Sequence, residues 1–195
     1  MSANLLTLRS VVAPRSSALT HALFIVGGTA FIAVMAQVSL PVPGSPVPVT
    51  GQTLAVLLVG TTYGARLGVA TFSTYLLAGI AGAPIFAGGT YGIDRVLGAT
   101  GGYLFGMLLA SAVLGFLAER RADQKFSTSF PALLLGNLII FSFGLTWLHF
   151  SLDLTWAKTF SMGLTPFILG EALKIAIVAT SLPLIWRKIS ERITQ

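Results

Sequence analysis

The sequence predicts an all-α integral membrane protein whose six spanning helices form one bundle with both termini on the cytoplasmic side. Three observations lead to this fold class. The 195 residues are 54% hydrophobic and only 9% charged, whereas soluble domains carry about 25% charged residues. The apolar residues fall into six runs, and the basic residues gather on one side of them. A soluble fold with so few charges would leave most of its surface apolar, so the exterior is expected to face lipid.

The six apolar runs are predicted as membrane spans in chain order. They cover residues 19–38, 53–63, 67–82, 100–118, 131–150 and 166–186. About 20 helical residues cross the roughly 30 Å of hydrocarbon, and most of the runs approach that length. The second run is the exception, because its eleven residues give only about 16 Å of helix. It is therefore either a short, partly irregular span or one half of a longer helix that continues to Gly82.

The Lys and Arg residues decide between these two readings, because loops that carry them tend to stay cytoplasmic. Six spans place nine basic residues inside and only Arg95 and Lys158 outside, with Lys174 left within a span. Merging residues 53–82 into one helix gives four inside against six outside and buries Arg66 in the membrane. The nine inside residues are Arg9, Arg15, Arg66, Arg120, Arg121, Lys125, Arg187, Lys188 and Arg192. The asymmetry accounts for the net charge of +6, so no nucleic-acid partner is expected.

The chain is predicted to form a single membrane domain over residues 1–195. Residues 1–18 form a cytoplasmic segment, residues 19–188 the bundle, and residues 189–195 a cytoplasmic tail. Arg9 and Arg15 ahead of the first apolar run also fit a cleaved signal peptide. That run is longer than a typical signal core, and five further spans follow, so a first spanning helix is the better interpretation.

A proline-rich connection joins the first two spans. Alternating prolines fix φ and remove backbone donors, which predicts a stiff, extended strap between residues 40 and 52. Thr50 and Gln52 place a hydroxyl and an amide where the strap re-enters the membrane. The alternative is a plain connector. The four prolines are Pro41, Pro43, Pro46 and Pro48.

The second outer connection, residues 83–99, is rich in glycine. Nine of the 21 glycines fall between Gly79 and Gly106. Glycine suits a loop that folds over a ligand, and it also suits tight helix packing. Packing explains Gly102 and Gly106 better than it explains the glycines of the loop itself. No Gly-Lys-Ser or Gly-Lys-Thr follows, so a phosphate-binding loop is excluded.

Glu171 and Lys174 lie within the last span, where an ionisable group costs about 2.5–3.5 kcal/mol on insertion scales. Their i, i+3 spacing places them on one helix face, where they could simply neutralise each other. Lys174 is also about 12 Å below the outer end of its helix, on the side of the strap and the glycine loop. The three features predict an outward-facing pocket for a ligand that carries N–H groups and an acidic or carbonyl oxygen.

Catalysis finds little support in the sequence. His21 and His149, the only imidazoles, are 128 positions apart and are predicted near opposite membrane faces. Cysteine is absent and the six acidic residues are scattered, so neither a catalytic dyad nor a metal site is expected. A membrane-embedded enzyme of lipid or isoprenoid metabolism is therefore disfavoured. No Walker motif is present, so the chain is not expected to hydrolyse ATP, and no cofactor is expected.

Four motifs together resemble the BioY family, the biotin-specific substrate-binding (S) components of energy-coupling factor (ECF) transporters. They are PVPVTGQ at residues 46–52, APIFAGG at 83–89, GATGGY at 98–103 and GEALK at 170–174. The resemblance covers roughly residues 19–188 with the motifs in order. It implies a six-helix bundle with an outward-opening vitamin pocket. It also implies biotin uptake by a multi-pass protein of a prokaryotic cytoplasmic (inner) membrane.

The resemblance implies that Glu171 and Lys174 contact biotin. Glu171 suits the two ureido N–H groups, while Lys174 suits either oxygen-bearing end. Many members carry Asp in place of Glu171, and some carry a basic or amide residue where this chain has Thr90 and Leu104. Whether Arg95 takes over that polar contact stays open. The remaining expected ligand residues are Gln52, Thr50, Gly88, Gly89, Thr90 and Tyr103.

The S components bind a membrane-coupling subunit through small residues of the first helix, commonly in an Ala-x-x-x-Ala pattern. Ala18 and Ala22 fit this pattern and form the expected partner interface, although such patterns are common in membrane helices. The resemblance thus implies a transmembrane coupling subunit and two ATPases as partners, beside biotin and the bilayer. Two alternatives stay open: a solitary biotin transporter without ATPase partners, and an S component for another vitamin.

Overall fold

Six helices make up the body of the protein in a computed structural model that describes residues 7–14 and 17–193. Each overlaps one of the six predicted runs, but the fifth helix begins five residues earlier than predicted, at Phe126, and the sixth ends seven residues later, at Ile193. Arg15, counted above among the inside charges, falls outside the described residues. The helices are α2 (Ala18–Gln37), α3 (Gln52–Tyr63), α4 (Ala65–Ile80), α6 (Gly101–Ala118), α7 (Phe126–Ser151) and α9 (Ile168–Ile193).

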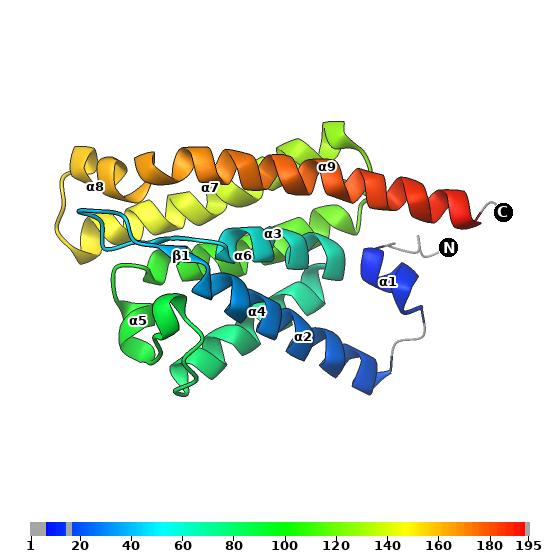
Figure 1. Ribbon diagram of the computed structural model, residues 1–195, viewed down its shortest axis with the longest axis horizontal. Helices are drawn as coiled ribbons and strands as arrows, with labels where there is room; N and C mark the ends of the chain where they lie inside the picture. The colour runs from blue at the N-terminus through cyan, green and yellow to red at the C-terminus, as the bar shows by residue number, and fades with distance from the viewer. Residues whose placement is uncertain (1–6, 15–16, 194–195) are drawn as a thin grey trace.

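Short elements at the two ends complete the fold, and none of them was predicted. They are α1 (Leu8–Val12), β1 (Ser39–Leu40), β2 (Val49–Thr50), the 3₁₀ helices η1 (Ala87–Gly89) and η2 (Thr165–Phe167), α5 (Ile93–Leu97) and α8 (Trp156–Gly163). The hairpin, α5 and α8 gather at one end of the bundle, while α1 and the last turns of α9 lie at the other (Figure 1). The proline strap and the glycine loop therefore share an end, as predicted.

The proline strap is a hairpin loop and not an extended segment throughout. Its two ends pair antiparallel, with Ser39 opposite Thr50 and Leu40 opposite Val49. Gly44 turns the chain with φ of 77°, a value that favours glycine. Ser45 Oγ donates to the carbonyl of Met162 at 2.9 Å, which attaches the loop to α8.

Four helical segments of the described chain are long and apolar enough to cross a membrane. They are Ala18–Gln37, Gly101–Ala118, Phe126–Ser151 and Trp156–Glu191, the last of which joins α8 to α9. The helix Ala65–Ile80 is apolar but shorter, and α3 has only 12 residues, about 18 Å of helix. The chain is thus a multi-spanning helical membrane protein, and the count of six spans stays a prediction.

The chain breaks between α3 and α4 at Gly64, so the alternative of one merged helix is wrong. Gly64 has φ of 84°, which a helix does not allow and which glycine adopts without strain. Glu119 Oε1 accepts the N–H of Ala65 at 3.0 Å, which satisfies a free donor at the start of α4. Arg66 follows at an exposed position of the first turn of α4.

Glycines allow α6 and α7 to pack closely. A Cβ on Gly106 would lie 2.8 Å from Ile140 Cα, and a Cβ on Gly102 would overlap Trp147. Both distances are too short for any larger residue, so the packing role predicted for these two glycines is confirmed. The close packing of α6 and α7 holds together the two helices that carry Tyr103 and Phe141, which line the candidate site.

Candidate functional site

A cavity of about 680 Å³, its opening included, lies between the hairpin, the glycine loop and helices α3, α4, α6, α7 and α9. It is on the end of the bundle where the sequence predicted a pocket. Of the predicted ligand residues it brings together Thr50, Gln52, Thr90, Tyr103 and Glu171. The rest of its lining is Val47, Pro48, Thr53, Tyr75, Phe86, Ala87, Arg95, Thr100, Leu104, Met107, Phe141 and Phe167.

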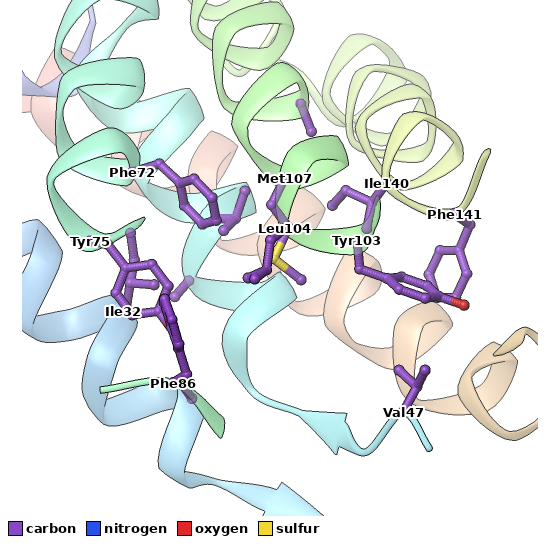
Figure 2. Close-up of a cluster of buried hydrophobic side chains, with 14 of the residues drawn as sticks. Ile32, Val47, Phe72, Tyr75, Phe86, Tyr103, Leu104, Met107, Ile140 and Phe141 are labelled. Atoms are coloured by element: carbon purple, nitrogen blue, oxygen red, sulfur yellow. The ribbon is translucent and has the colours of Figure 1, made fainter. Parts of the chain in front are cut away.

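Aromatic side chains form two walls of this cavity. Figure 2 shows Tyr75 and Phe86 on one side and Tyr103 and Phe141 on the other. Each pair meets edge to face, with ring centroids 5.5 Å apart for Tyr75 and Phe86 and 5.8 Å apart for Tyr103 and Phe141. Gly144 lies against the Tyr103 ring, where a Cβ would overlap it. The walls suit a largely apolar molecule.

A buried polar network forms the floor around Glu171. Its Oε1 accepts from Thr53 Oγ1 at 2.8 Å and from Lys174 Nζ at 2.6 Å, and its Oε2 accepts from Asn137 Nδ2 at 3.0 Å. Lys174 Nζ also donates to the Thr50 carbonyl at 2.6 Å and to Thr53 Oγ1 at 2.8 Å. Its three N–H groups thus have three acceptors. The predicted i, i+3 pair exists, and it connects α9 with α3, α7 and β2.

Three of the predicted ligand residues do not line the cavity. Lys174 lies behind Glu171, with its ammonium engaged by protein atoms. Gly88 and Gly89 are exposed, at φ of 71° and 69°, and it is their neighbours Ala87 and Thr90 that face the cavity. The two glycines therefore provide the turn that aims the loop.

Gln37, at the end of α2, holds the glycine loop in place and was missed from the sequence. Its Nε2, with two N–H hydrogens, lies within hydrogen-bond distance of the carbonyls of Ile85 at 3.2 Å and Phe86 at 3.1 Å and of Ala33 in its own helix at 3.2 Å, so one hydrogen is shared between two of them. Its Oε1 accepts the N–H of Gly89 at 2.8 Å. The amide thus adds to the loop's own backbone bond, in which the N–H of Gly89 donates to the Phe86 carbonyl at 3.0 Å.

Gln52, Tyr75 and Tyr103 form hydrogen bonds around the edge of this polar floor. Gln52 Nε2 donates to Tyr75 Oη at 3.1 Å, and the Tyr75 hydroxyl donates to the Ile85 carbonyl at 3.1 Å. The Tyr103 hydroxyl donates to the Gly163 carbonyl at 2.8 Å. Within the described chain Gln52 Oε1 has no such partner, which leaves one acceptor open toward the cavity.

Arg95 is the one cationic side chain that lines the cavity in the described part of the chain. It is exposed and belongs to α5, so it stands at the mouth and not at the floor. Leu104, by contrast, is buried and apolar, and Thr90 Oγ1 donates to the Ala87 carbonyl at 3.0 Å. Arg95 therefore supplies positive charge that neither of those positions offers.

Some of the cavity residues that were not predicted carried a recognisable signal in the sequence, and others did not. Asn137 is the only amide in the apolar run 131–150, so its polarity was a usable signal. Thr53 directly follows Gln52 and could have been grouped with it. The aromatic residues gave no signal, because Phe141 and Phe167 on a membrane helix are equally compatible with lipid.

Known proteins are similar to this chain over most of its length. The model of the BioY family matches residues 8–191. The biotin transporter BioY2 of Lactococcus lactis is 38% identical over 154 residues, which cover 77% of this chain and 81% of that protein. The biotin transporter BioY of Thermotoga maritima is 36% identical over 151 residues, covering 77% and 86%.

A solved structure has the same fold. The crystal structure of the S-component for biotin from an ECF-type ABC transporter superposes with a TM-score of 0.79. The match covers 87% of this chain and 92% of that one at 23% sequence identity.

Proposed function

The chain belongs to the BioY family, and from this premise we propose that it binds biotin in the cavity above Glu171 and serves biotin uptake as the substrate-binding subunit of an ECF-type transporter. The observation that carries the proposal is the pairing of an aromatic cavity with a single polar floor. Pockets for small molecules are commonly apolar with a few placed polar groups that fix the ligand's orientation.

The floor matches the ureido ring of biotin, which has two N–H donors and one carbonyl acceptor. Gln52 Oε1 is an open acceptor, and the Glu171 carboxylate lines the same cavity with one lone pair, on Oε2, beyond the three that its partners use. The edge-to-face aromatic walls are suited to the fused rings and the aliphatic chain. Lys174 then acts by holding the Glu171 carboxylate in position from 2.6 Å away.

The mouth matches the carboxylate of biotin. Arg95 can donate two parallel hydrogen bonds to a carboxylate, the geometry that a guanidinium favours. Glu171 carries negative charge at the opposite end of the cavity and disfavours the carboxylate there. We therefore propose that the ureido ring lies at the floor and the carboxylate beside Arg95.

Calorimetry on the detergent-purified protein tests both parts of this proposal. Biotin should bind, and riboflavin and thiamin should not. Arg95→Ala should weaken biotin binding about tenfold or more, since a charge-assisted contact is lost, but should leave biotin amide unaffected. Equal losses for biotin and its amide would overturn the orientation. Absence of biotin binding by the unmodified protein would overturn the function.

We propose six spans with both termini cytoplasmic, in the cytoplasmic membrane. The even count is supported by the position of α1 and the last turns of α9 at the same end of the bundle (Figure 1). The short helices α3 and α4 supply the second and third crossings. The nine-to-two distribution of basic residues supports the direction of insertion.

We also propose that α2 docks on a transmembrane coupling subunit that brings the ATPases. Only 11% of its span is buried inside the protein, so α2 is the most peripheral of the four long apolar segments. Ala18 and Ala22 are exposed on it, beside apolar neighbours such as Leu19 and Leu23. Co-purification from cells that express the coupling module tests this assignment, and biotin uptake in cells without that module would favour the solitary transporter.

A further inference from the structure

An open groove lies at the end of the bundle opposite the biotin cavity. It runs between the segment that joins α6 to α7 and the last turns of α9. Its floor is apolar, with contributions from Phe126, Ala179, Pro183 and Leu184, and Lys125 and Arg187 stand at its rim. None of these six residues takes part in the site described above.

Backbone chemistry and a buried hydrogen bond hold this groove open. Pro183 has no N–H, so it cannot donate to the carbonyl of Ala179 one turn earlier in α9. Both residues lie at the groove, where Ala179 is buried beneath the surface and Pro183 is partly exposed. Trp186 Nε1 donates to Asp123 Oδ2 at 2.6 Å, and both residues are buried. This bond fixes the α6–α7 segment against α9, so the groove is preformed.

The rim is positively charged without a strong internal partner. Arg187 Nε lies 3.7 Å from Glu191 Oε1, but the two side chains are 70% and 64% exposed, so the pair is weak. Lys125 is exposed, and the described chain contributes no acidic side chain to the lining. Two cations thus stand above an apolar surface with little to neutralise them.

The groove extends from its charged rim toward the bilayer centre. From Arg187 to the exposed Thr180 the helix descends seven residues, about 10 Å. The proposed topology places this end on the cytoplasmic side, where bacterial membranes carry anionic lipids that attract juxtamembrane basic residues. A free phosphate would use the rim but not the floor, and a neutral lipid would use the floor but not the rim.

We propose that this groove binds one anionic phospholipid of the cytoplasmic leaflet, with its phosphate between Lys125 and Arg187 and one acyl chain along Pro183 and Leu184. The site is independent of the biotin cavity. It assigns a function to the α6–α7 segment, which biotin binding leaves unused.

The test measures which lipid stays bound to the purified protein. The protein is reconstituted in an equimolar mixture of phosphatidylglycerol and phosphatidylcholine, extracted in mild detergent and analysed by native mass spectrometry. Retained phosphatidylglycerol should exceed phosphatidylcholine, and Lys125→Ala/Arg187→Ala should lower its retention about tenfold. The charge-matched control Arg66→Ala/Lys188→Ala removes two exposed cations that do not line the groove, and it should retain the lipid. Equal losses in both double variants, or equal retention of the two lipids by the unmodified protein, would overturn the proposal.

A second variant tests the floor without changing charge. Thr180 is exposed in the groove and its hydroxyl bonds only to carbonyls of its own helix, so Thr180→Trp fills the groove. Retention of phosphatidylglycerol should fall as far as in the charge variant. Leu184→Asp, at a position that is 50% exposed, provides a second route by setting a negative charge on the floor. Normal retention in the floor variants would reduce the site to surface electrostatics and would overturn the acyl-chain assignment.

Discussion

The pair formed by Glu171 and Lys174 makes a prediction that separates ligand binding from folding. Glu171→Gln removes a charge with little change in shape. It leaves the Lys174 ammonium, whose side chain is 14% exposed, with the Thr50 carbonyl and the Thr53 hydroxyl but with no counter-charge. Breaking a buried ion pair from one side costs about 3–5 kcal/mol, whereas replacing both partners is often neutral. Glu171→Gln should therefore destabilise the protein, and Glu171→Gln/Lys174→Met should restore most of its stability.

The expected magnitudes follow from the contacts. A loss of 3–5 kcal/mol corresponds to a fall in melting temperature of about 6–20 °C for a chain of this length. Biotin binding should weaken roughly 10- to 100-fold in both the single and the double variant, because a hydrogen bond to a charged group is worth about 1.5–3 kcal/mol. Thermal unfolding in detergent measures the first quantity and calorimetry the second. Glu191→Gln, which breaks the exposed pair with Arg187, is the matched control and should change neither.

Two results would refute this reasoning. A double variant that binds biotin as tightly as the unmodified protein would show that the pair serves folding alone. A Glu171→Gln protein that melts at the unmodified temperature would show that Lys174 does not depend on this carboxylate, despite the 2.6 Å separation.

Three further predictions concern the rest of the molecule. Cysteines at Pro43 and at Ser127, both exposed, should react with an impermeant maleimide in whole cells only at position 43, and labelling at 127 would reverse or refute the topology. Ala22→Leu should reduce co-purification with a coupling subunit while biotin affinity is retained, and intact assembly would remove α2 from the interface. Burial raises the pKa of the Asp123 carboxyl to about 6 against a partly offsetting hydrogen bond from Trp186, so the folded protein keeps this proton where the unfolded chain, with a pKa near 3.8, has lost it. The contribution of Asp123 to stability should therefore decline between about pH 4 and pH 6 and stay level above pH 6. Asp123→Asn should abolish the corresponding decline in melting temperature. Equal pH profiles of melting temperature for the variant and the unmodified protein would contradict this prediction.

The helices were predictable because the bilayer imposes a strong pattern on the sequence. Length, apolar content and the placement of Arg66 separated α3 from α4, and Gly64 ends the first of them. The paired Glu171 and Lys174 could be found because charges are costly in lipid.

The inner surface of the cavity could not be predicted in the same way. In a soluble protein the apolar face of a helix points inward, but here both faces are apolar, so periodicity does not separate a pocket residue such as Phe141 from a lipid-facing one such as Phe143. The hairpin and α5 depend on contacts between distant segments. Gln37, which holds a loop about 50 residues away, carries no local mark of that role.

The hydrogen bonds of Gln37 make α2 and the glycine loop a single mechanical unit. One amide at the end of α2 holds Ile85, Phe86 and Gly89, and the Phe86 ring forms a wall of the cavity. A tilt of α2 must therefore either carry that wall along or break three inter-segment hydrogen bonds at once. Of the four long apolar segments, the one with the smallest buried share is thus also joined by hydrogen bonds to a wall of the cavity.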